Sequence, residues 1–96
     1  MPGGAEHGSV AIRFGENLRR CRGATGLTQE DVAYFTSLHR TEIGLLERGQ
    51  RRARIDTVVR LAAALSVSPD ELFKGIVWEL PRLGDGCFRI VPPEDE

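Results

Sequence analysis

Cysteine and histidine are scarce in this 96-residue chain, which holds two of each. Cys21 and Cys87 are too few for a paired disulfide framework, and they lack the close spacing of a metal-binding motif. Cys21 falls on an apolar stripe, where a thiol usually serves as a small buried hydrophobe. These scarcities exclude a disulfide-stapled domain and argue against a zinc site, so we expect no metal and no cofactor.

Long hydrophobic runs are also missing. None approaches the roughly 20 apolar residues that a membrane span requires. The first ten residues, MPGGAEHGSV, have neither the basic end nor the apolar segment of a signal peptide. The simplest expectation is a cytoplasmic protein with no membrane partner. Because residues 1–10 are Gly-rich and sparsely apolar, we expect them to form a flexible N-terminal arm.

Patterns that would indicate an enzyme are not found. No Ser/His/Asp or Cys/His set falls on matching elements, and no phosphate-binding loop is present. A chain of this length has room for one small domain with tails. The sequence therefore favours a binding domain over an enzyme.

The net charge is only −1, but the charge is unevenly distributed. From Ile12 to Arg54 there are nine arginines and five acids, a balance of +4, whereas Ile55 to Glu96 holds four basic and eight acidic residues, a balance of −4. Glu6 supplies the remaining −1. This asymmetry predicts a basic surface on the N-terminal half, of the kind that binds nucleic acid, and an acidic end on the other half.

The stretch LTQEDVAYFTSLHRTEIGLLERG, from Leu27 to Gly49, has the pattern of two short helices joined by a tight turn. We expect the first helix over Gln29–Phe35, capped by Thr28, and the second over His39–Arg48, ended by the glycine that follows it. Five apolar residues at helical spacing would bury one side of each helix and one residue of the turn: Val32, Ala33, Leu38, Ile43 and Leu46.

The outer side of the second helix is expected to be polar, and a short helix of this kind, held by another, is the form that enters a DNA major groove. Arg40 can pair with a guanine, Glu42 can accept from a cytosine amine, and Leu45 can contact a thymine methyl group. Thr41 can serve a base or a phosphate. Alternatively, Glu42 pairs with a neighbouring arginine such as Arg40 and touches no base. The residues expected to face outward are Arg40, Thr41, Glu42, Gly44, Leu45 and Arg48.

Three further helices are predicted around this pair. The first spans about Ala11–Ala24, and the fourth spans about Ile55–Leu65. The fifth opens with Ser68-Pro69-Asp70-Glu71, which combines an N-cap, a proline at the first helical position and a capping box. The inward side chains are expected to be Phe14, Leu18 and Cys21 of the first helix, Ile55, Val58, Val59, Ala62 and Leu65 of the fourth, and Leu72 and Phe73 of the fifth.

Taken together, these motifs resemble the helix-turn-helix of the Xre/Cro/C1 repressor family. The LTQE start, Ala33, Ile43 and the Glu47-Arg48-Gly49 ending match that pattern, and IDTVVRLAAALSVSPDELF is similar to the family's fourth and fifth helices. The resemblance implies an all-α, five-helix, lambda-repressor-like DNA-binding domain over residues 11–76. It also implies a transcriptional regulator that is usually dimeric and binds double-stranded DNA.

The resemblance also implies roles for particular residues. Arg22 and Glu47 would form a semi-buried ion pair that joins the first and third helices, and Gln29 would approach a phosphate. His39 stands where the family more often has Ser or Thr, so it either contacts phosphate or faces water, and Ser37 would share the capping.

The loop QRRAR after the third helix has three arginines where the family commonly has a more neutral turn. Such a charge run is usually a solvated surface. In this position it would flank the groove, so we expect phosphate contacts from Arg51 and Arg52, beside Arg48 at the helix end.

Residues 77–96 form a C-terminal extension. The runs VWEL and CFRIV, separated by the turn-forming PRLGDG, predict a β-hairpin or two extended segments. An isolated hairpin cannot hide their apolar side chains, so they must pack on the helical domain or on a second chain. We therefore expect a dimerisation segment here, followed by a solvated acidic tail, Glu94-Asp95-Glu96.

The favoured function is sequence-specific DNA binding by a small regulator, acting as a dimeric repressor that reads a palindromic operator through its third helix. The alternative is a protein-interaction module, or an antitoxin-like partner, with the same fold. Tyr34, Phe35 and Leu45 would then contact a protein. The arginines on both sides of the third helix favour DNA, because an interaction module would not need positive charge there.

Overall fold

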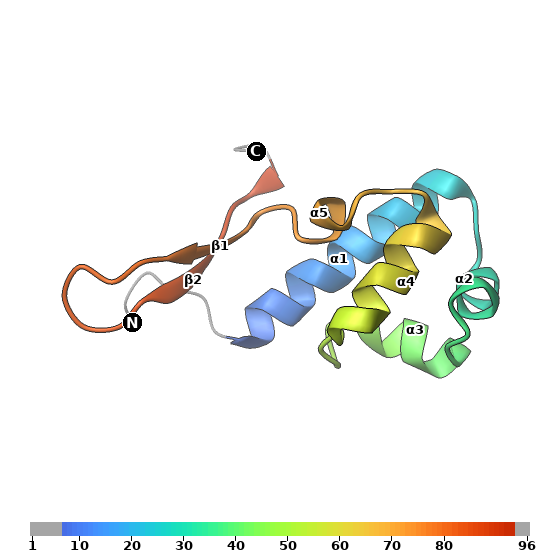
Figure 1. The fold of residues 1–96 in the computed structure, drawn as a ribbon, viewed down its shortest axis with the longest axis horizontal. Coiled ribbons are helices and arrows are strands. Elements are labelled where there is room, and N and C mark those ends of the chain that lie inside the picture. The colour runs from blue at the N-terminus through green and yellow to red at the C-terminus, as the bar shows by residue number, and fades with distance from the viewer. Residues whose placement is uncertain (1–6, 94–96) are drawn as a thin grey trace.

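The computed structural model describes residues 7–93 as five helices followed by one β-hairpin (Figure 1), which confirms the predicted order of elements. No helix in this range is both long and apolar enough to cross a membrane. The elements are α1 (His7–Thr25), α2 (Gln29–Thr36), α3 (Arg40–Glu47), α4 (Ile55–Leu65), α5 (Pro69–Leu72), β1 (Ile76–Glu79) and β2 (Cys87–Ile90).

All five helices contribute side chains to one hydrophobic core. The hairpin projects from one end of this helical body, opposite α2 (Figure 1), and the molecule measures 46 × 24 × 19 Å along its principal axes. Burial of these apolar groups is the main driving force for folding. The core consists of Phe14, Leu18 and Cys21 from α1, Val32 and Ala33 from α2, Ile43 and Leu46 from α3, Val58, Leu61, Ala62 and Leu65 from α4, and Leu72 from α5.

The first helix begins earlier than predicted. α1 starts at His7, so residues 7–10 of the expected arm are helical, and residues 1–6 of it lie outside the described part of the chain. The glycine and serine there disfavour a helix, but Val10 is half-buried and Ala11 is only 8% exposed. Packing of this first turn therefore outweighs its weak intrinsic propensity.

The inner side of α4 differs from the prediction. Ile55 and Val59 are 88% and 59% exposed, whereas Leu61 is completely buried and Thr57 is 5% exposed. Apolar residues cover more than half of this helix, so periodicity alone does not identify the side that packs on the body. The expectation that Ile55 and Val59 belong to the core was wrong.

The fifth helix is a single turn that begins with Pro69, as predicted. Its expected capping box is not formed, because the Ser68 hydroxyl bonds to the Asp70 carboxylate and caps no backbone N–H. That hydrogen bond lowers the pKa of Asp70. Leu72 is fully buried, but Phe73 remains 46% exposed, so only the first of the two closes the core.

Two glycines allow α1 and α3 to approach closely. A Cβ atom at Gly15 would clash with the carbonyl oxygens of Leu46 and Glu47 at the end of α3. One at Gly49, which has φ +71°, would lie 2.7 Å from the Cα of Ile12. The end of α3 is therefore fixed against α1 by backbone contact as well as by side chains.

The hairpin is antiparallel, with Trp78 opposite Phe88. Their rings pack edge to face with centroids 5.0 Å apart, yet Trp78 stays 50% exposed. Ile76 packs against the helical core, and Val91 N–H donates to the Gly75 carbonyl at 2.8 Å. The base of the hairpin is thus joined to the body, and the acidic tail at 94–96 lies outside the described residues.

Candidate nucleic-acid interface

The start of α2 is fixed by a reciprocal capping box. The Thr28 hydroxyl accepts from the Asp31 backbone N–H at 3.0 Å, and the Asp31 carboxylate accepts from the Thr28 backbone N–H at 2.9 Å. These hydrogen bonds, from the Thr28 backbone first, lower the pKa of Asp31. The cap was predicted from the sequence, and the first turn that it begins lies beside the end of α3, where Gln29 contacts Glu47.

The turn between α2 and α3 is built differently from the prediction. Ser37 does not share the capping of α3, because it ends α2 in a left-handed conformation at φ 60°. His39 alone caps α3: its Nδ1 accepts from the Thr41 backbone N–H at 3.1 Å. The ring is exposed, so its Nε2 edge can meet solvent or a phosphate.

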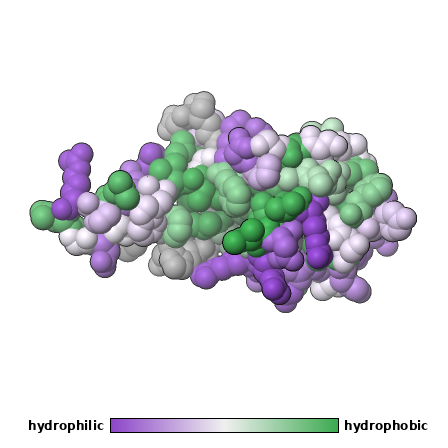
Figure 2. Space-filling view, viewed as in Figure 1, coloured by the Kyte–Doolittle hydropathy of each residue, from purple (hydrophilic) through white to green (hydrophobic). Residues whose placement is uncertain are grey.

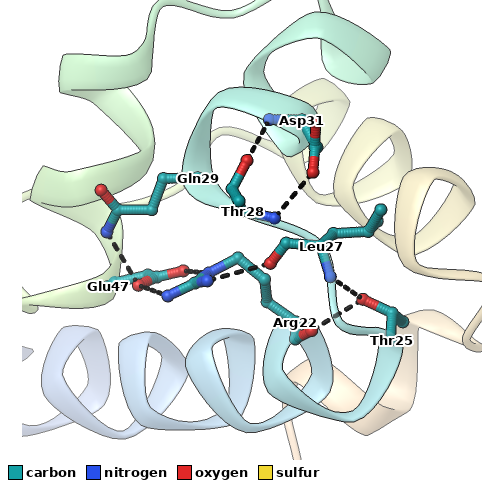
Figure 3. A network of polar contacts seen from close by, with 7 residues as sticks. All are labelled: Arg22, Thr25, Leu27, Thr28, Gln29, Asp31 and Glu47. Carbon is teal, nitrogen blue, oxygen red and sulfur yellow. Dashed lines mark hydrogen bonds and ion pairs between the residues drawn. The ribbon is translucent and has the colours of Figure 1, made fainter.

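A network of polar contacts joins the ends of α1, α2 and α3 (Figure 3). The Arg22 guanidinium donates to both Glu47 carboxylate oxygens, with an Nη2–Oε1 distance of 3.0 Å, and to the Leu27 carbonyl at 3.0 Å. Gln29 Nε2 also donates to Glu47 Oε1 at 3.0 Å. The side chains of Arg22 and Glu47 are 19% and 4% exposed. The predicted semi-buried ion pair is present.

Burial and hydrogen bonding oppose each other at Glu47. Burial alone would raise the pKa of its carboxyl, but the hydrogen bonds from Arg22 and Gln29, together with the Arg22 charge, outweigh burial and lower it. The hydrogen bond to Glu47 raises the pKa of Arg22 in turn. Both groups are therefore charged near neutral pH, and the pair joins α1 to the end of α3.

The outer side of α3 is close to the prediction. Arg40 and Thr41 are exposed, Glu42 and Leu45 are half-buried, and Ile43 and Leu46 on the inner side are fully buried. One position was wrong: Gly44 is buried. A Cβ there would lie 3.1 Å from the Arg48 Nη1, so the Arg48 guanidinium covers this glycine.

The arginines beside α3 fall into two groups. Arg48 and Arg51 have side-chain partners, since Arg48 Nε donates to Gln50 Oε1 at 3.2 Å and Arg51 pairs with Glu42. Arg40 and Arg52 are exposed and have no side-chain partner within residues 7–93. The alternative that Glu42 pairs with an arginine is therefore correct, although its partner is Arg51 and not Arg40.

Four of the nine predicted contact residues lie on α3, and its two cap positions, the α2 start and the following loop add the others. Gln29 is held to the end of α3 through Glu47, and Arg51 reaches back from the loop to the first turn. Sequence reasoning missed Gln50, which accepts a hydrogen bond from Arg48, and it placed Gly44 on the outer side without its Arg48 cover. The nine residues are Gln29, His39, Arg40, Thr41, Glu42, Leu45, Arg48, Arg51 and Arg52.

Comparison with known proteins identifies this arrangement. A model of the helix-turn-helix domain matches residues 13–73, which is more than half of the chain and covers most of α1 and all of α2 to α5. The chain belongs to the helix-turn-helix family. That family is one of DNA-binding transcription regulators, which are not a class of enzymes. Within residues 7–93 no group of three His, Cys, Asp or Glu side chains is placed to hold a metal ion.

Several relatives of this helix-turn-helix protein are control proteins. It is 34% identical to the control protein C.BamHI of Bacillus amyloliquefaciens over 67% of this chain and 80% of the relative. It is 42% identical to the control protein C.SmaI of Serratia marcescens over 59% of this chain and 68% of the relative. Other relatives are named HTH-type transcriptional regulators.

The solved structures agree with the sequence relatives. The restriction-modification controller protein C.AhdI from Aeromonas hydrophila superposes with a TM-score of 0.66 and 42% identity, covering 68% of this chain and 98% of that one. The described hairpin follows the helical region that the family model matches, because that match ends at residue 73.

Proposed function

We propose that this protein binds double-stranded DNA sequence-specifically as a homodimeric transcriptional regulator, and that α3 reads the bases of a palindromic operator. The observation that supports this most strongly is the outer side of α3. Arg40 and Thr41 are exposed there beside Leu45, on a helix whose last residue, Glu47, is held by Arg22 of α1 and Gln29 of α2. A rigid helix with outward base-reading groups suits insertion into a major groove.

Base contacts are assigned to the first half of α3. The Arg40 side chain, which has no partner within residues 7–93, is free to offer two N–H groups to the O6 and N7 of a guanine. Leu45 offers only apolar contact, which suits a thymine methyl group, and Thr41 can donate to a base or a phosphate.

Backbone contacts are assigned to the flanks. Gln29 lies at the start of α2, where the first N–H groups of a helix have no intrahelical acceptor and can bind a phosphate oxygen. Its side-chain amide uses one N–H for Glu47 and keeps the other. His39 through Nε2, Arg48 and Arg52 would contact phosphates on either side of the groove.

The dimer is proposed to form through the apolar groove between α4 and the hairpin. This groove has a volume of about 670 Å³, and Figure 2 shows hydrophobic surface gathered where the hairpin meets the helical body. Ile55, Val59 and Phe73 are exposed along it, and the hairpin adds Ile76 and Phe88. A second copy would cover this surface and bring two α3 helices to successive major grooves.

The dimer proposal is tested by light scattering on point variants of the full chain. Val59→Glu places a charge in the groove and should shift the mass toward the monomer. The matched control, Tyr34→Ser, alters a side chain that is 81% exposed on α2 and should leave the mass unchanged. A Val59→Glu protein that remains dimeric would move the interface away from α4.

Sequence-specific binding is tested by selection from a pool of random duplexes. We expect enrichment of a palindrome with half-sites about one DNA turn apart, since two α3 helices related by a two-fold axis read two half-sites. A pool without enrichment would refute sequence-specific binding, and enrichment of a single asymmetric site would refute the symmetric dimer.

A protein partner is the second candidate. The side chains of Tyr34 and Phe35 pack edge to face with centroids 5.5 Å apart and are 81% and 59% exposed. Exposed aromatic side chains are common at protein interfaces. If Tyr34→Ser and Phe35→Ser leave operator binding intact but abolish regulation in cells, this surface contacts a protein and not DNA.

A further inference from the structure

Arg51 is held against the helix that is proposed to read the bases. Its Nη1 donates to Glu42 Oε1, so a loop residue reaches back over α3 to the first helical turn, nine positions earlier in the chain. The Glu42 side chain is 24% exposed and that of Arg51 is 51% exposed. The guanidinium is therefore fixed at one edge and open to solvent elsewhere.

This pairing separates Arg51 from the neighbouring loop arginines. Arg52 has no side-chain partner within residues 7–93, and Arg54 lies 3.8 Å from Asp56, a longer and more exposed ion pair. A free guanidinium adds a full positive charge toward DNA, and its contact with a phosphate releases counterions. The Arg51–Glu42 pair has no net charge, so it is poorly suited to this role.

The hydrogen bonds that remain on Arg51 suit a base. A guanidinium has five N–H groups in a planar fork, and Glu42 accepts from only one nitrogen. Two parallel N–H groups remain for the O6 and N7 of a guanine. Because the ion pair already restricts the side-chain rotamers, less conformational entropy is lost when the base contact forms.

The carboxylate is well placed for a supporting role. Glu42 lies in the first turn of α3, where the helix dipole favours a negative charge. Its pairing with Arg51 offsets the repulsion that an unpaired carboxylate would meet beside DNA phosphates. The Glu42 carboxylate thus already accepts a hydrogen bond from Arg51, so it gains less from accepting one from a cytosine amine.

We propose that Glu42 is a positioning residue and that Arg51 reads a guanine in each half-site, in place of the phosphate contact expected from the sequence. This inference rests on the proposed function, because it assumes that α3 enters the major groove. It adds a second guanine reader to Arg40 and makes the pair a determinant of specificity.

The test measures binding of four variants to the selected operator and to all its single-base substitutions, at several salt concentrations. Arg51→Ala should weaken the best site by roughly 5- to 100-fold and remove discrimination at one G·C pair per half-site. Arg51→Lys keeps the charge but lacks the planar fork, so it should lose the same discrimination. The matched control, Arg52→Ala, should lower the affinity for all sequences alike. It should also make the dependence of log affinity on log salt concentration less steep, by the amount expected for one phosphate contact per subunit.

Glu42→Gln provides the discriminating measurement. It keeps an acceptor but removes the charge, so Arg51 should become a free cation that binds phosphate. We expect tighter binding to every sequence, a steeper salt dependence and weaker preference at the base pair that Arg51→Ala also affects. A merely structural role would change the melting temperature without this change in base preference.

Two results would overturn the inference. One is an Arg51→Ala protein that loses affinity equally across the panel with a flatter salt slope, because that is the behaviour of a phosphate contact. The other is a Glu42→Gln protein with unchanged base preference. Both leave sequence-specific binding by the wild-type protein intact, whereas a wild-type protein that enriches no duplex would overturn this inference together with the proposed function.

Discussion

Replacing Arg22 by methionine should destabilise the fold by about 3 kcal/mol, because it leaves the Glu47 carboxylate buried without its cation. The Glu47 side chain is only 4% exposed, and Gln29 would remain as its one side-chain donor. Methionine keeps most of the apolar stem, so the lost packing is small. The estimate lies at the low end for a broken buried pair, since Arg22 is itself 19% exposed and water can reach its place.

This loss is large for the protein. A 96-residue domain is expected to have a stability of roughly 5–14 kcal/mol, so the variant should lose a substantial share of it. At about 4–8 °C per kcal/mol for a domain of this size, the melting temperature should fall by roughly 12–24 °C. Urea unfolding followed by far-UV circular dichroism measures the free energy directly.

Two further variants test the reasoning. The double variant Arg22→Met/Glu47→Leu removes both charges, so its free energy of unfolding should lie within about 1.5 kcal/mol of that of the wild type. The control Arg52→Met alters an exposed arginine of the loop after α3 and should change stability by less than about 0.5 kcal/mol. An Arg22→Met protein that loses under about 1 kcal/mol, or a double variant as unstable as the single one, would refute the account of this pair.

Three other predictions concern packing, pH and salt. Gly15→Ala should destabilise the protein by at least about 2 kcal/mol in urea unfolding, because its Cβ meets the α3 backbone, while Gly23→Ala, which has nothing within 4 Å, should be neutral or slightly stabilising. Because the folded-state pKa of Glu47 is lowered, the stability that ionised Glu47 contributes should be fully present above the unfolded pKa of about 4.3 and lost as the pH falls through the folded pKa. The difference in free energy of unfolding between the wild type and Glu47→Gln should therefore stay constant above about pH 5 and narrow below it. A difference that does not change with pH would contradict this. Operator affinity should fall on the order of a thousandfold between about 50 and 200 mM salt, and equal affinity at both would exclude a binding mode dominated by phosphate contacts.

Local chemistry explains which parts of the fold could be predicted. The Thr28 cap, the α4 bounds and Pro69 at the start of α5 depend on neighbouring residues, and each was found as predicted. The Arg22–Glu47 pair spans 25 positions, and only the family resemblance implied it. Features that depend on how the helices pack together were predicted less well.

The side of α4 that packs inward is one such feature. Leu61 is buried and Ile55 exposed although both are large and apolar, because the shape of the neighbouring helices selects the side. Asn17 is another: it is 1% exposed and donates to the carbonyls of Leu72 and Lys74, both at 2.9 Å, which no local pattern indicates. Because Leu72 and Lys74 lie more than 50 positions after Asn17 in the chain, these hydrogen bonds depend on the completed fold.

In the candidate site, too, the features set by one helix were predicted and those set by distant parts of the chain were not. The outward positions of Arg40, Thr41 and Leu45 follow from helical periodicity and agree with the structure. The partner of Glu42 could not be chosen from sequence, because Arg51 lies beyond the end of α3 and reaches Glu42 only through the path of the loop. Periodicity describes one helix at a time, whereas the charge on its surface also depends on the loop that follows.

The central claim is that the outer side of α3 reads bases, and the most direct test is the binding of Arg40→Ala to a panel of single-base operator variants. The account predicts a loss of roughly 1–3 kcal/mol at the best site and relaxed preference at one G·C pair per half-site, with discrimination elsewhere unchanged. An equal loss of affinity across the whole panel would mean that Arg40 holds a phosphate, and the assignment of the reading side of α3 would then be wrong.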